Sequence, residues 1–133
     1  MGLIVVDAGI VIAILDSADT HHKPAQRSLR EALSNGAALV IPASAYAEML
    51  VAPYRAGPDK AALLDALIDA LPATIQPITR PIAHAAAELR ARHGARLRLP
   101  DALVVATALD LHADQILTTD RRWPELDVRI EAV

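Results

Sequence analysis

The chain has 133 residues, of which 53% are hydrophobic and 22% charged, a composition typical of a globular domain and not of a disordered segment. It contains no Cys, which excludes disulfides, thiolate zinc sites and cysteine nucleophiles, and with two Tyr, one Trp and no Phe it lacks an aromatic platform for stacking single-stranded bases. The net charge of −3 means that binding to a nucleic acid requires a local basic patch or bound cations.

The hydrophobic pattern alternates between strands and helices along the whole chain. In chain order we expect a strand at Leu3–Val6, a short helix at Ile10–Leu15, a helix at Lys23–Ser34, a strand at Ala38–Ile41, a helix capped by Ser44 and ending at Arg55, a helix from Pro58 whose apolar stripe ends at Leu71, a strand at Thr74–Ile78, helices at Pro81–His93 and Pro100–His112, a strand at Gln115–Thr119 and an edge strand at Asp127–Ala132. Strands separated by helices, without a tight hairpin, predict an α/β fold. We expect a three-layer sandwich around a central, mainly parallel sheet of four to five strands, in a single domain spanning residues 1–133.

The longest apolar stretch, Leu3 to Leu15, is too short to cross a membrane and is interrupted by Asp7. No basic residue precedes it, whereas a secretion signal begins with a positively charged segment. We therefore expect a soluble, cytoplasmic protein without a membrane partner.

Four acidic residues do not fit the pattern of solvated helix faces. Asp7 and Asp120 each follow a predicted strand, at the end where α/β proteins place their ligands. Asp101 begins the helix before the Gln115–Thr119 strand. A helix that packs antiparallel to a strand of the same length has its start beside the strand's end, and here twelve helical residues span about 18 Å while five strand residues span about 17 Å. Asp101 is therefore expected level with Asp120, and Glu48, just over one turn into its helix, near the same edge.

Carboxylates that meet at one sheet edge repel one another unless cations share the space. Hard ions such as Mg²⁺ or Mn²⁺ prefer oxygen ligands of this kind. A pair of such ions activates a water and stabilises the leaving oxygen of a phosphodiester. A shared metal site is thus one explanation of the pattern.

Simpler explanations exist for two of the four residues. A helix dipole favours an Asp in the first turn, where Asp101 lies, and Asp120 is positioned to cap the turn at Arg121 and Arg122. Glu48 lies among apolar neighbours without a capping partner, and Asp7 interrupts an apolar run in which an unpaired charge costs several kcal/mol. The pattern alone leaves both explanations open.

Four segments together resemble a PIN domain, and more narrowly a VapC-type toxin of a toxin–antitoxin pair. The segments are Val5–Ile12, Ile41–Pro42 followed by Glu48, Leu99–Ala108 and Ile116–Trp123. The resemblance implies an endoribonuclease that depends on Mg²⁺ or Mn²⁺, with Asp7, Glu48, Asp101 and Asp120 at the family's acidic positions and Thr118 as a supporting hydroxyl. It also implies a homodimer, a cognate antitoxin, and tRNA or rRNA as substrate. One departure is Ala8, where the family often has Ser or Thr.

Basic residues flank two of the acidic positions. Arg96 and Arg98 precede Asp101, while Arg121 and Arg122 follow Asp120. We interpret these four arginines as contacts for the RNA backbone, although a solvated helix end and loop would also account for them.

Two other functions would require different features of the sequence. A receiver-type signalling domain needs paired acids after the first strand and a lysine near the fifth, and a haloacid-dehalogenase-like phosphatase needs Asp-x-Asp where this chain has Asp7-Ala8-Gly9. A catalytically inactive PIN module that only binds a partner is the remaining alternative, because Ala8 departs from the family pattern.

Overall fold

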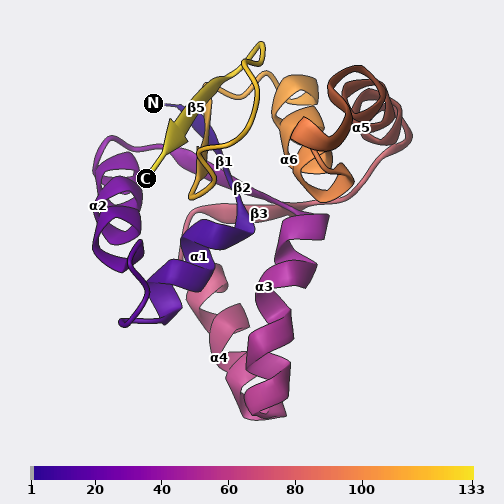
Figure 1. The fold of residues 1–133 in the computed structure, drawn as a ribbon. Helices are drawn as coiled ribbons and strands as arrows, with labels where there is room; N and C mark the ends of the chain where they lie inside the picture. Colours follow the sequence, from indigo (N-terminus) through magenta and orange to yellow (C-terminus); the bar gives the residue numbers. More distant parts are fainter. Residues whose placement is uncertain (1) are drawn as a thin grey trace.

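The chain is built around one β-sheet, with helices packed against both of its faces (Figure 1). The computed structural model describes residues 2–133. Over that range the strands are β1 (Leu3–Val6), β2 (Ala38–Pro42), β3 (Ala73–Gln76), β4 (Gln115–Thr118) and β5 (Arg129–Ala132). The helices are α1 (Ala8–Leu15), α2 (His22–Ser34), α3 (Ala43–Ala56), α4 (Pro58–Asp69), α5 (Arg80–His93), α6 (Leu99–Asp110) and the short 3-10 helix η1 (Gly94–Arg96).

The strand order is β3-β2-β1-β4-β5, and every neighbouring pair is parallel. The chain starts at the central strand β1, moves outward through β2 to β3, and then returns to the other side of β1 to form β4 and β5. Such a reversal leaves a crevice at the carboxyl ends of the two strands that flank it. The topology therefore points to the ends of β1 and β4 as the place for a ligand.

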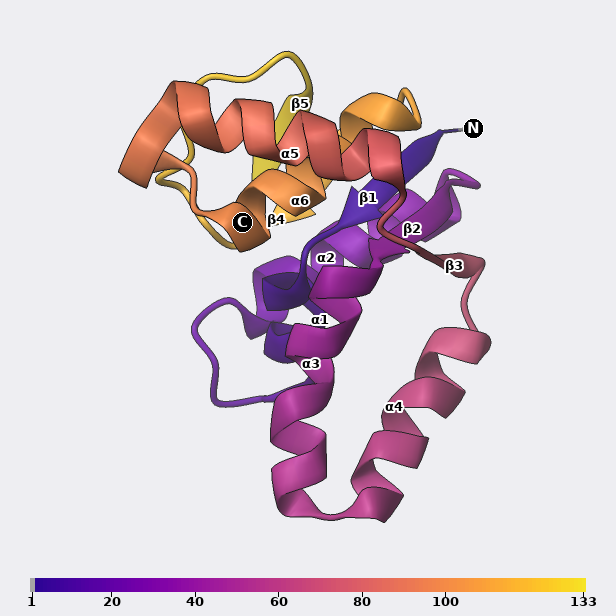
Figure 2. The ribbon, with the colours of Figure 1, turned by 90° about the vertical axis from the view of Figure 1, so that its right-hand side faces the viewer.

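The sheet is buried because apolar helices cover both faces, which confirms the predicted α/β sandwich. On one face, Val6 of β1 and Ile41 of β2 line an apolar pocket with Val11 of α1, Leu29 of α2 and Ile68 of α4. On the other face, α6 packs against β1, β2 and β4 and is covered in turn by α5 (Figures 1 and 2). Among residues 2–133, no helix is long and apolar enough to cross a membrane.

Helices α3 and α4 form a hairpin that projects beyond the sheet (Figure 2). The turn between them is made at Gly57, whose φ of 142° is a conformation that favours glycine. Away from this turn, the Tyr46 hydroxyl donates a hydrogen bond to the Asp65 carboxylate, which links the two helices. The hairpin thus places Glu48 on a helix that contacts α1, α4 and α6.

Several predicted boundaries differ from the observed ones, and three of these differences have a clear physical reason. The first helix begins at Ala8 because the Asp7 side chain accepts the Ala8 N–H. Ser44 is not a helix cap, since α3 starts at Ala43 directly after Pro42, and the buried Ser44 Oγ has no hydrogen-bond partner among the described residues. Strand β3 lies at Ala73–Gln76, earlier than predicted, because Pro77 has no N–H with which to continue the ladder.

Candidate active site

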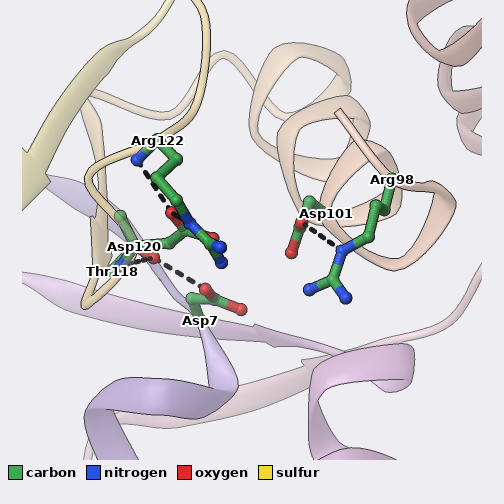
Figure 3. Close-up of polar contacts among 6 residues, drawn as sticks. All are labelled: Asp7, Arg98, Asp101, Thr118, Asp120 and Arg122. Carbon is green, nitrogen blue, oxygen red and sulfur yellow. Dashed lines mark hydrogen bonds and ion pairs between the residues drawn. The ribbon is translucent and has the colours of Figure 1, made fainter. Parts of the chain in front are cut away.

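The ends of β1 and β4 are tied together by one buried hydroxyl. The strands pair with Val6 opposite Leu117, and the Asp7 N–H donates to the Leu117 carbonyl at 2.9 Å. Thr118 is fully buried, and its hydroxyl donates to Asp7 Oδ2 at 2.7 Å while accepting the Asp120 N–H at 3.1 Å. Thr118, which the resemblance assigned a supporting role, therefore fixes the positions of both strand-end aspartates (Figure 3).

Asp7 lies deepest in the site. Its Oδ1 accepts the Ala8 N–H at 2.9 Å, so both carboxylate oxygens have a hydrogen-bond donor. Burial nevertheless raises the pKa of Asp7, because these two hydrogen bonds do not compensate for lost hydration, and the charges of Asp101 and Asp120 raise it further. The effect of those two charges on Asp7 shows that three predicted acidic residues share one electrostatic environment.

Asp101 lies in the first turn of α6, at the same edge of the sheet as Asp120 (Figure 3). Arg98, three residues earlier, places its Nε 3.7 Å from Asp101 Oδ2. Burial raises the pKa of Asp101, and the positive charge of Arg98 reduces this shift without cancelling it. Asp101 and Asp120 therefore lie at the same edge, as the lengths of the helix and the strand predicted.

Asp120 lies two residues after the last residue of β4, Thr118, and is paired with Arg122. Its Oδ1 accepts the backbone N–H of Arg122 at 2.8 Å and the Arg122 Nε at 3.3 Å, and its Oδ2 accepts Nη2 at 3.3 Å. Burial acts to raise the pKa of Asp120, but the hydrogen bonds and charge of Arg122 outweigh it and lower the pKa. Asp120 thus caps the turn after β4, as the simpler explanation expected, and also lies within reach of the charges of the other two aspartates.

Glu48 approaches the group from α3 and is the most exposed of the four predicted acids. Partial burial raises the pKa of Glu48, and the charges of Asp7 and Asp101 raise it further, while Arg98 opposes the shift. Glu48 therefore lies within reach of the charges of Asp7 and Asp101, at the edge of the sheet where those two aspartates lie.

The donor set fits a hard divalent ion in its chemistry, because every side chain supplies anionic oxygen. The side chains are not arranged around an ion as they stand: within residues 2–133, no three His, Cys, Asp or Glu side chains are placed to hold one. Asp101 and Asp120 instead face the guanidinium groups of Arg98 and Arg122 (Figure 3). Metal ligation by Asp7, Glu48, Asp101 and Asp120 therefore stays a prediction.

A basic cavity of about 210 Å³ adjoins the acidic group. It is lined by three of the four arginines expected to contact RNA and by two of the acids; these residues are Arg96, Arg98, Arg122, Asp101 and Asp120. Arg121 is exposed and lines a neighbouring hollow instead. The structure thus brings Arg96, Arg98 and Arg122 together and separates Arg121 from them.

Sequence reasoning missed two features of this cavity. Trp123 lines it, and its Nε1 is shielded from solvent without an acceptor in the described part of the chain. The pairing of Arg98 with Asp101 was also missed, although a spacing of three residues at a helix start is a recognised signal for an ion pair. For Arg122 the sequence held no comparable signal, because its pairing depends on the turn after β4.

Comparisons with known proteins agree on the family and the fold. A model of the PIN domain matches residues 4–129. Among solved structures, the chain is similar to DNA-bound VapBC from Salmonella typhimurium, with 15% identity and a TM-score of 0.75 over 99% of this chain and 98% of that one. It is also similar to VapBC2 from Rickettsia felis bound to promoter DNA, with 15% identity and a TM-score of 0.74 over 98% of each chain. A third similar structure is VapC20 from Mycobacterium tuberculosis, described as a toxin that cleaves the sarcin–ricin loop, with 18% identity and a TM-score of 0.68 over 93% of this chain and 91% of that one. No curated protein matches the sequence. At these identities the solved structures support the fold, and the match over residues 4–129 shows that the chain belongs to the PIN domain family.

Proposed function

We propose that this protein is a metal-dependent endoribonuclease and the toxin of a type II toxin–antitoxin pair, acting in the cytoplasm to inhibit translation. The observation that carries the proposal is the convergence of Asp7, Asp101 and Asp120 at one edge of the sheet, beside a cavity lined by arginines. An acidic group provides sites for cations, and the basic cavity provides sites for phosphates. Membership of the PIN family supports this combination.

In this mechanism Asp7, Asp101 and Asp120 would hold Mg²⁺ or Mn²⁺, and Glu48 would supply a further ligand or orient the attacking water. The chemistry that such an ion would supply is activation of a water and stabilisation of the leaving oxygen of the phosphodiester. Thr118 fixes the carboxylate of Asp7 through its 2.7 Å hydrogen bond, so the deepest ligand is already oriented before substrate binds.

The arginines position the RNA. Arg96, Arg98 and Arg122 offer forked donors around one cavity, a geometry suited to phosphate oxygens. Arg121, at the neighbouring hollow, extends the basic surface beyond this cavity. Since phosphate contacts position a nucleic acid without reading its bases, these residues leave open which tRNA or rRNA is cut.

A cognate antitoxin is the proposed protein partner, with a homodimer as the active assembly. Several of the similar structures are toxin–antitoxin complexes. On this chain, an apolar groove of about 410 Å³ between α1, α3 and α4 exposes Ile12, Leu15 and Leu63. Exposed apolar side chains grouped in this way are typical of a surface that binds another protein.

The decisive experiment is cleavage of total RNA by the purified protein with Mg²⁺ or Mn²⁺, followed by mapping of the cut ends. We expect discrete cuts that disappear with a chelator and in the Asp101→Asn variant. The matched control is Asp110→Asn, which removes the same charge from an exposed position at the far end of the same helix and should cut normally. Cleavage by Asp101→Asn at the rate of Asp110→Asn would refute the proposed site.

A catalytically inactive binding module is the second candidate. It is favoured by Ala8, which removes a hydroxyl next to Asp7, and by the absence of a preformed ion cage among residues 2–133. The same experiment separates the two functions, because an inactive module binds its partner and leaves RNA intact at every metal concentration.

A further inference from the structure

Two arginines at the candidate site hold carboxylates that a metal ion would also need. Arg98 contacts Asp101 across 3.7 Å, and Arg122 uses Nε and Nη2, each at 3.3 Å, to contact both oxygens of Asp120. Figure 3 shows the Arg122 guanidinium beside Asp120 and the Arg98 guanidinium beside Asp101, with Asp7 close by. The acidic group is therefore already partly neutralised by the chain's own cations.

Both ion pairs are easily broken. The Arg98 and Arg122 side chains are 70% and 84% exposed, whereas their partners Asp101 and Asp120 are only 17% and 18% exposed. Each arginine is two or three residues from its partner, so each pair forms within one short stretch of chain. Exposed pairs of this kind contribute little to stability, and their long side chains move freely.

A divalent ion and a guanidinium group compete for the same carboxylate oxygens. When an ion binds Asp101 and Asp120, it displaces the hydrogen bonds of Arg98 and Arg122, and its positive charge repels both side chains. The two guanidinium groups still line the 210 Å³ cavity after they leave the carboxylates, and each is then free to bind a phosphate through two parallel N–H bonds.

We propose that Arg98 and Arg122 exchange partners: they pair with Asp101 and Asp120 while the site holds no divalent ion, and they bind the phosphates of RNA once an ion has taken those carboxylates. This inference rests on the proposed function and adds a coupling to it. Because binding free energies are linked, the ion strengthens RNA binding and RNA strengthens ion binding to the same degree. RNA binding is thereby favoured on the protein that carries its ion.

The exchange predicts opposite effects of one substitution on two ligands. Arg98→Ala and Arg122→Ala each remove a competitor of the ion and a contact of the RNA. Ion affinity should rise and RNA affinity should fall. An arginine that only contacts RNA would leave ion affinity unchanged, and a purely structural arginine would weaken both.

The test is calorimetric titration of Mn²⁺ into the wild-type protein and into the variants Arg98→Ala, Arg122→Ala and Arg121→Ala. Arg121→Ala is the charge-matched control, because Arg121 lies next to Arg122 in the same loop and has no ion pair within residues 2–133. We expect the two test variants to bind Mn²⁺ up to about fivefold more tightly than the control.

Binding of a short oligouridylate RNA is then measured with and without Mn²⁺ over a range of salt, and the RNA is checked for intactness on a gel. We expect Mn²⁺ to tighten RNA binding by the wild type, and Arg122→Ala to lower the salt slope in Mn²⁺ by about 0.7, the loss of one phosphate contact to a single strand.

The outcomes separate this inference from the function on which it rests. A wild-type protein that binds no Mn²⁺ overturns the proposed metal site and the exchange together. A wild type that binds Mn²⁺ and cuts RNA, with both test variants binding Mn²⁺ no more tightly than Arg121→Ala, overturns the exchange alone.

Discussion

Replacing Asp7 by Asn should leave the metal-free protein as stable as the wild type, or more stable, at neutral pH. Burial and the charges of Asp101 and Asp120 raise the pKa of Asp7 above its ordinary value of 3.8. Between 3.8 and the raised value, the folded chain binds more protons than the unfolded chain, so the free energy of unfolding falls as the pH rises. At neutral pH the ionised carboxylate is therefore a cost that Asn does not carry.

The magnitude follows from two opposing contributions. Each unit by which a folded-state pKa exceeds the unfolded value removes about 1.4 kcal/mol of stability at neutral pH. Asn keeps an acceptor for the Ala8 N–H but loses the charged acceptor of the Thr118 hydroxyl, which costs about 1 kcal/mol. The hydrogen-bond loss is present at every pH, whereas the charge contribution appears only once Asp7 ionises.

The quantity to measure is therefore the difference between variant and wild type as a function of pH. Thermal unfolding in a chelator at about pH 4 and about pH 7 should show this difference shifting in favour of Asp7→Asn, by about 4 °C for each kcal/mol in a chain of this size. Added Mg²⁺ should then stabilise the wild type and leave the variant nearly unchanged. If the variant is less stable by the same amount at both pH values, Asp7 is only a helix cap and the reasoning is wrong.

Three further results follow from the same geometry. Thr118→Val should lower the free energy of unfolding by about 1–3 kcal/mol, because it leaves the Asp120 N–H and an Asp7 oxygen without partners, while Thr118→Ser should not; urea denaturation measures both. The pKa values of Asp7, Glu48 and Asp101 are raised, so as the pH is lowered at limiting Mg²⁺, RNA cleavage should begin to fall at a pH higher than the ordinary pKa of Asp. Saturating Mg²⁺ should move this fall to lower pH. Tyr46→Phe removes an exposed bond between α3 and α4, so it should cost less than about 1 kcal/mol and leave cleavage rates unchanged.

The positions of the acidic residues were predictable because they depend on topology and not on detail. In a parallel sheet the carboxyl ends of β1 and β4 lie at one edge, which fixes Asp7 and the region of Asp120 before any side chain is placed. The height of Asp101 followed from the rise per residue of a helix and of a strand, two constants that vary little between proteins. Regular geometry was sufficient for this part of the site.

The remaining details depend on local competition between groups that sequence patterns do not rank. Ser44 was expected to cap a helix because Ser favours that position, but Pro42 ends β2 and is followed at once by α3, which leaves Ser44 inside the first turn. Whether Arg122 turns toward Asp120 or toward solvent depends on the Asp120 Oδ1 already accepting the Arg122 backbone N–H, a feature of the turn. Such choices involve about 1 kcal/mol or less, too little to leave a pattern in composition or spacing.

The charges of this site are compensated unequally, and the inequality indicates where a cation acts. Asp101 and Asp120 lie near the mouth and each has an arginine, whereas in the described chain Asp7 has only the Thr118 hydroxyl and the Ala8 N–H. Hydrogen bonds from neutral donors do not restore the hydration that a buried carboxylate loses, so its pKa stays raised. A divalent ion that contacts Asp7 therefore relieves the largest uncompensated charge, while the contacts that it displaces at Asp101 and Asp120 are weak and exposed. Under the proposed exchange, the same two arginines would then become available to phosphates, so that one binding event would both neutralise the base of the site and free its arginines for RNA.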